Sequence, residues 1–199
     1  MKFIKKTKTE LSIVALFLVL MAVILRFLPH LPNFTPVAAI ALFGGVYFSR
    51  KIALILPITA MFISDIFIGF YEPLIMLSVY GSFVLCVLLG FWLKKHKNWF
   101  TVLGSAFTCS LMFFVITNFA VWAFSPWYAK TLSGLVQCYL MATPFFRNTL
   151  LGDLFYASVF FGAYEMVELW VKNRIGVKQE CYLIDNKIKG DDYFEKSFS

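Results

Sequence analysis

The feature that most constrains this chain is a series of apolar runs, most of them long enough to cross a lipid bilayer. The runs cover residues 11–28, 36–48, 52–71, 74–93, 101–124 and 148–171. A helix needs about 20 apolar residues to span the hydrocarbon core, and it satisfies all of its backbone polar groups internally. The runs therefore predict an all-α integral membrane protein built on a six-transmembrane-helix bundle.

Composition excludes the main alternatives to a membrane protein. Hydrophobic residues make up 60% of the chain and charged residues 15%, against roughly 45–50% and 25% in average globular proteins. A soluble domain of 22.8 kDa could not bury that much apolar surface. The net charge of +7 does not indicate nucleic-acid binding, because the charges flank the apolar runs. The expected surroundings are the lipid bilayer.

One further segment, residues 132–146, has a weaker apolar character than the six runs. It holds only about 15 residues and includes Gly134, Gln137 and Pro144. It is short for a span, and irregular backbone survives at membrane depth only where protein or water covers it. We expect an extra re-entrant or hairpin helix, packed against the bundle before the last span.

The distribution of basic residues predicts the orientation. Twelve of the 18 Lys and Arg lie in four segments that would share one side of the membrane, and Arg26, Lys130 and Arg147 lie on the other. The positive-inside rule places the richer side in the cytoplasm. We therefore expect a multi-pass protein of the cell (inner or plasma) membrane with both termini cytoplasmic. Residues 1–10 would form a basic N-terminal segment, 11–171 the membrane domain and 172–199 a cytoplasmic tail.

Three polar residues fall within the apolar runs at one depth. Asp65, Asn118 and Asp153 lie five or six residues from the predicted outer ends of three helices, or about 7–9 Å below the surface. A carboxylate facing lipid costs several kcal/mol. We expect the three to converge on one hollow, where they would bind a ligand. The alternative is a satisfied polar network that only fixes helix packing.

The predicted outer loops supply aromatic and polar groups above these three residues. The candidates are Asn33, Trp127, Tyr128, Arg147 and Asn148. Aromatic faces with a few polar groups are typical of a small-molecule pocket. Trp127 and Tyr128 would equally suit an interfacial aromatic belt.

No pattern indicates catalysis. The chain lacks the nucleophile-elbow, zinc-protease, Walker and dinucleotide-loop motifs. Its four cysteines form no C-x-x-C pair, and both histidines lie outside the apolar runs. We predict no catalytic residue, no metal and no cofactor, so the protein is not expected to be an enzyme.

Two stretches resemble known membrane proteins. LPNFTPVAAIALFGGVYF followed by ITAMFISDIFIGFY resembles the first half of S components, the substrate-binding subunits of energy-coupling-factor transporters. FFRNTLLGDLFY resembles an uncharacterised family of small bacterial membrane proteins related to them. The matched motifs are Ser64–Asp65 and Arg147 to Asp153. The chain departs from S components on its first helix, where Val19 follows Ala15 in place of a second alanine.

The resemblance implies a ligand held near the outer face and a partner module of ATP-hydrolysing and coupling membrane subunits. We therefore expect a membrane-embedded binding subunit for a small extracellular solute, vitamin-like or otherwise polar, that takes part in uptake. The alternative is a structural or scaffold membrane protein that binds protein partners and no ligand.

Overall fold

The structure is a computed structural model that describes the backbone of residues 8–27 and 33–195 and the side chains of residues 13–27 and 33–171. Within these residues the chain is helical and contains no strand, which confirms the prediction of an all-α protein. The helices are α1 Lys8–Phe27, α2 Val37–Tyr47, α3 Arg50–Ile68, α4 Pro73–Leu93, α5 Trp99–Phe124 and α6 Leu132–Glu195. Most of the predicted basic segment 1–10 lies outside the described residues, as do the side chains of the predicted tail 172–199.

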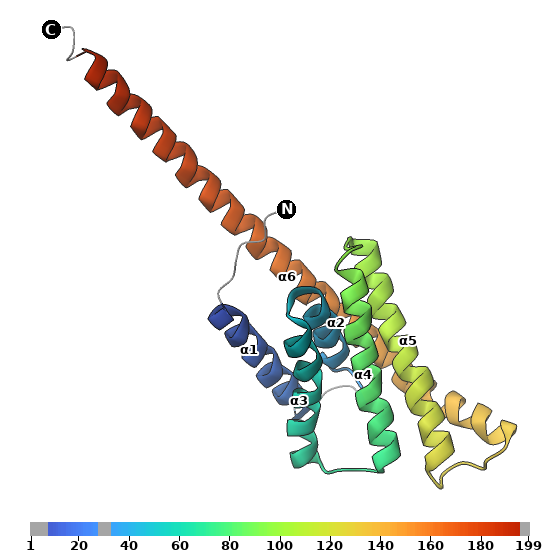
Figure 1. Cartoon of the computed structure of the whole chain (residues 1–199). Helices are drawn as coiled ribbons and strands as arrows, with labels where there is room; N and C mark the ends of the chain where they lie inside the picture. The colour runs from blue at the N-terminus through green and yellow to red at the C-terminus, as the bar shows by residue number, and fades with distance from the viewer. Residues whose placement is uncertain (1–7, 28–32, 196–199) are drawn as a thin grey trace. The chain divides into compact units, whose positions relative to one another are not determined.

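The chain divides into two compact units, Met1–Phe160 and Phe161–Ser199. The first unit holds α1 to α5 and the start of α6. In it, α2 contacts α3, α4 and α5, while α1 contacts α3 (Figure 1). The second unit continues α6 as helical backbone to Glu195.

The short helix α2 is the centre of the first unit, because every residue from Val37 to Val46 is buried. Its contact with α4 depends on two glycines. A Cβ atom on Gly45 would lie 2.5 Å from the Val87 carbonyl oxygen, and one on Gly90 would lie 2.5 Å from the Leu42 carbonyl oxygen. The two backbones can approach this closely only because neither glycine has a side chain.

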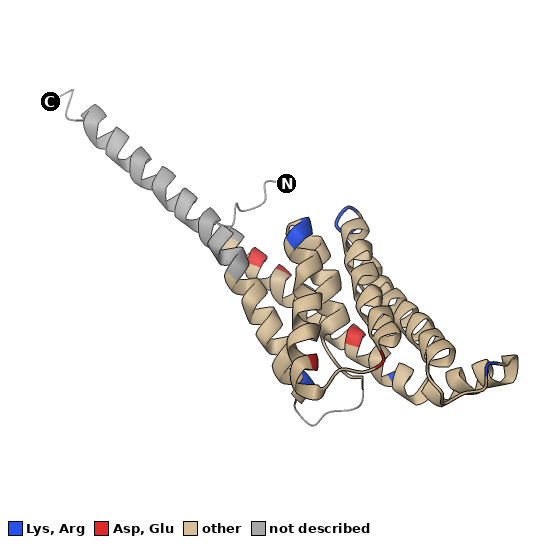
Figure 2. Ribbon diagram, turned by 60° about the horizontal axis from the view of Figure 1, so that its bottom comes forward, with Lys and Arg blue, Asp and Glu red and all other residues tan. Residues whose placement is uncertain are grey.

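Four helices are long and apolar enough to cross a membrane: α3, α4, α5 and the Leu132–Val171 part of α6. Two shorter apolar helices, Ile13–Phe27 and Val37–Tyr47, accompany them. Figure 2 shows Lys and Arg where α3 begins and where α4 turns into α5, with few charges along the helices between. This arrangement agrees with a multi-pass membrane protein.

The segment 132–146 differs from the prediction. It is not a separate re-entrant or hairpin helix, because α6 begins at Leu132 and continues without a break through Pro144. Proline removes one backbone hydrogen bond from a helix interior, but membrane helices tolerate it where neighbouring helices surround the freed carbonyl. Tyr139 ties this part of α6 to α5 through a hydrogen bond of 2.7 Å from its hydroxyl to the Val115 carbonyl.

Candidate functional site

A cavity of about 210 Å³ lies among the N-terminal half of α4, the C-terminal half of α5 and the start of α6. Each helix contributes one face, since its lining residues recur three or four positions apart. Those residues are Ile75 and Val79 on α4, Phe113, Phe114, Thr117, Asn118 and Val121 on α5, Ala142, Phe145, Phe146 and Thr149 on α6, and Asn33 before α2. The lining is therefore mainly aromatic and aliphatic, with a few hydroxyl and amide groups.

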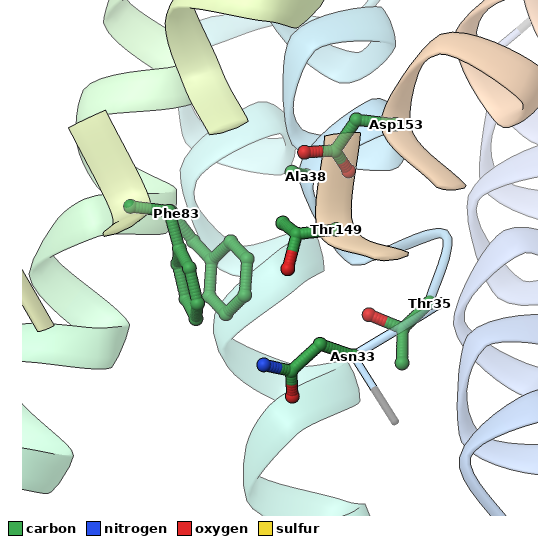
Figure 3. A pocket seen from close by; sticks show the side chains of 7 residues that line it. Asn33, Thr35, Ala38, Phe83, Thr149 and Asp153 are labelled. Carbon is green, nitrogen blue, oxygen red and sulfur yellow. The ribbon is translucent and has the colours of Figure 1, made fainter. Parts of the chain in front are cut away.

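A smaller cavity of about 40 Å³ adjoins the first and ends at Asp153. The two cavities share Asn33, Phe113 and Thr149 as lining residues. Figure 3 shows Asp153 and Thr149 on α6, Asn33 and Thr35 on the segment before α2, and Phe83 on the other side of the pocket. Among the described residues that line the two cavities, Asp153 alone has an ionisable side chain.

Asp153 is 2% exposed, and its carboxylate is held from α5. The Ser110 hydroxyl donates a hydrogen bond of 2.6 Å to Oδ2 of Asp153. Within the described side chains, Asp153 forms no ion pair with Lys or Arg. A buried carboxylate without a positive partner is costly, so this end of the site is suited to a positively charged group.

The segment before α2 is positioned by a backbone turn and by close packing on α6. Asn33 has a φ of 64°, a left-handed conformation that asparagine adopts more readily than most residues. The next residue, Phe34, lies against α6 at Gly152, where a Cβ atom would come within 3.3 Å of the Phe34 Cα atom. The Phe34 ring also packs on Tyr156, with 5.5 Å between ring centroids. These contacts hold Asn33 near Asp153.

Asp65 has a different environment from Asp153. Its Oδ1 lies 3.0 Å from the Arg26 guanidinium, and its Oδ2 accepts a hydrogen bond of 2.8 Å from the Tyr80 hydroxyl. Arg26 also donates to the Ser64 hydroxyl. Burial, followed by the negative charge of Asp65, raises the pKa of Tyr71, in the turn between α3 and α4, to about 12. Asp65 thus has its positive partner within the protein and lines neither of the two cavities.

The structure brings together three of the eight predicted ligand-binding residues. Asn118 lines the larger cavity, Asp153 the smaller one, and Asn33 both. The other five line neither cavity: Asp65 is in the ion pair, Trp127 is 75% exposed, Arg147 is exposed, and Tyr128 and Asn148 are half-buried. The expectation that Asp65 shares one hollow with Asn118 and Asp153 does not match these two cavities. Ligand binding by each of the eight residues stays a prediction.

Sequence reasoning missed several residues of the site. Thr149 lies one helical turn before Asp153, and Thr117 is next to Asn118. Helical spacing from Asp153 could have identified Thr149, whereas adjacent positions on a helix point in different directions, so spacing alone did not indicate Thr117. Ser110 could have been found two turns before Asn118 on α5, but no sequence signal linked it to Asp153. Arg26 was noted only as a charge at the end of a span, and no sequence signal linked it to Asp65.

The four long apolar helices indicate a multi-pass helical membrane protein, and its two adjoining cavities end at a buried carboxylate. Over residues 5–175 the chain matches the family of unknown function DUF6580, and it belongs to that family. No curated protein and no solved structure matches it.

Proposed function

We propose that the protein is a membrane-embedded binding subunit for a small solute and takes part in its uptake. The observation that supports this proposal is the pair of adjoining cavities of about 210 and 40 Å³. An apolar cavity of about 150 Å³ is large enough to bind benzene. An apolar chamber with a few convergent polar groups is the usual form of a small-molecule site.

The orientation that we propose opens this site to the outside of the cell. The cavities are lined by Ile75 near the start of α4 and by Val121 near the end of α5. Lys94, Lys95 and Lys97 lie at the opposite end of these helices, which the positive-inside rule assigns to the cytoplasm. On this basis both chain termini are cytoplasmic, and α1 and α2 complete a six-helix membrane domain.

Uptake against a gradient requires an energy source, and the resemblance to S components supplies a candidate. We propose that the protein works with a module of ATP-hydrolysing and coupling membrane subunits. The first helix restricts where a coupling subunit could bind, because Val19 and Ala22 are buried within the chain itself. A coupling subunit would therefore have to dock on another face of α1.

The experiment that tests the proposed function measures the melting temperature of the purified full-length protein in detergent. Vitamins, nucleobases, amines, alcohols and carboxylates are added one at a time. The matched variants are Ala142→Phe, which fills the larger cavity, and Met141→Phe, which adds an aromatic ring at the neighbouring exposed position. A ligand should stabilise the native protein and Met141→Phe, but not Ala142→Phe.

The alternative, a scaffold protein without a ligand, predicts a different result. No compound would then raise the melting temperature, and purification from native membranes would yield stable protein partners without nucleotide-hydrolysing subunits. That pair of results would reject the binding function.

A further inference from the structure

We propose that the solute is an organic cation, with an amine that binds Asp153 in the smaller cavity and an apolar body of one or two rings in the larger cavity. This inference rests on the proposed function, because it names the class of solute for the same two cavities.

The charge of the solute follows from a comparison of the two buried carboxylates. Asp65 is 1% exposed and Asp153 is 2% exposed. Arg26 lies 3.0 Å from Asp65, whereas within the described side chains Asp153 has the Ser110 hydroxyl and no ion pair. A buried charge is normally paired. A ligand ammonium would give Asp153 the partner that Asp65 already has.

The position of the amine follows from the size of the smaller cavity. A space of about 40 Å³ exceeds the 10–15 Å³ or so that one water molecule needs, and an ammonium group is of similar size to water. An ammonium carries several N–H donors. Besides the carboxylate, it would find oxygen acceptors on Thr35, Thr149 and Asn33, which line the same space (Figure 3).

The body of the solute follows from the larger cavity. Four phenylalanines, Phe113, Phe114, Phe145 and Phe146, line it. Phe114 and Phe146 pack together with 4.7 Å between ring centroids. Aromatic faces bind rings and apolar chains, and they also attract cations. The Asn118 amide and the Thr117 hydroxyl each donate to a backbone carbonyl of α5, so their two oxygens provide acceptors for the part of the body remote from the amine.

An inorganic cation such as Na⁺ is the rival occupant, because hard cations bind carboxylate, hydroxyl and amide oxygens. Such an ion would use the smaller cavity alone and leave the larger one without a role. The adjoining aromatic chamber therefore favours an organic cation. Within the described residues, no group of three or more His, Cys, Asp or Glu side chains is placed to hold a metal ion.

The test uses matched probes and the purified full-length protein in detergent. Cyclohexylmethyl, benzyl and naphthylmethyl bodies are each supplied as the ammonium, the alcohol and the carboxylate, and sodium chloride is added as a separate arm. Binding is measured by thermal shift and isothermal titration calorimetry. We expect at least one ammonium to bind about tenfold or more tightly than its alcohol, and its carboxylate to bind most weakly.

Three variants test whether the preference for the ammonium depends on the carboxylate of Asp153. Asp153→Asn keeps the shape of the side chain and removes the charge, and it should lower ammonium affinity by about tenfold or more. Asp65→Asn removes an equally buried carboxylate that lines neither cavity, and Glu72→Gln removes an exposed one. Both should retain the preference for the ammonium. Because the folding of each variant is followed by its melting temperature without ligand, a loss of binding can be separated from a loss of structure.

Each remaining outcome counts against part of the proposal. Alcohols or carboxylates that bind as well as ammoniums, with binding lost in Ala142→Phe, would overturn the organic cation and leave the binding function standing. Stabilisation by sodium chloride alone that Asp153→Asn abolishes would assign the site to an inorganic ion. If no probe binds, and the wider set of compounds also has no effect, both the inference and the proposed function are wrong.

Discussion

Arg26 on α1 and Asp65 on α3 form an ion pair of 3.0 Å, in which the carboxylate is 1% exposed and the arginine side chain 17% exposed. Breaking a buried pair by removing one partner leaves an uncompensated charge, which typically costs about 3–5 kcal/mol. We predict that Arg26→Met lowers the free energy of unfolding by about 3 kcal/mol, measured by reversible denaturant unfolding in micelles.

The double variant Arg26→Met with Asp65→Leu provides the control for this prediction. It removes both charges and should be more stable than Arg26→Met alone, because no unpaired carboxylate remains. If the double variant were less stable than the single one, the ion pair would not be the reason for the loss.

The crossing of α2 and α4 gives a second prediction, on packing. A Cβ atom at Gly45 would lie 2.8 Å from the Gly90 Cα atom, so Gly45→Ala forces two helix backbones apart. Overpacking of this kind costs about 1–3 kcal/mol. Gly104→Ala is the matched control, because nothing lies within 4 Å of a Cβ atom there. The melting temperature should fall for Gly45→Ala and stay the same or rise for Gly104→Ala.

Most helix boundaries could be predicted from the sequence because local residues determine them. The predicted helix 36–48 became Val37–Tyr47, and the predicted helix 74–93 became Pro73–Leu93. Pro36 and Pro73 favour a helix start, and Lys94 and Lys95 end the apolar run of α4. The start of α6 was predicted wrongly, because Gly134, Gln137 and Pro144 weaken the helical pattern of the local sequence. In the structure, contacts with α5 support one continuous helix.

The site was predicted only in part, because the sequence gives the depth of a residue along its helix but not the direction in which its side chain faces. That direction depends on how the helices pack. Asp65, Asn118 and Asp153 have similar predicted depths, but the side of each helix on which they lie depends on how the helices rotate against their neighbours. Asp65 points to Arg26, and Asp153 lines a cavity with Asn33. Positions on one helix, such as Thr149 and Asp153, share a face by spacing alone. Positions on different helices needed the structure.

A third prediction distinguishes the effect of the Asn33 backbone conformation on stability from the effect of its side-chain amide on binding. Glycine adopts a φ of 64° at least as readily as asparagine, so Asn33→Gly should keep the turn. Asn33→Ala should be less stable by about 1 kcal/mol, because a Cβ atom disfavours the left-handed conformation. Both variants remove the amide from the junction of the two cavities. We therefore expect both to bind an ammonium probe more weakly by calorimetry, and only Asn33→Ala to show a lower melting temperature. Equal melting temperatures would contradict the role of the backbone.

The last prediction concerns the side of the membrane on which the cavities open. Glu72 and Lys95 are exposed residues at opposite ends of α4, whose 21 residues span about 30 Å. A membrane-impermeant maleimide applied to intact cells should label Glu72→Cys at once, and Lys95→Cys only after permeabilisation, with the unsubstituted protein as the reference. Cys86, Cys109 and Cys138 are buried and should add little background. The fourth cysteine, Cys181, lies in the predicted cytoplasmic tail, so Cys181→Ser is introduced into all three proteins, the reference included. The reverse pattern would place the end of the bundle that holds the cavities in the cytoplasm, so that a solute could reach Asp153 only from inside the cell.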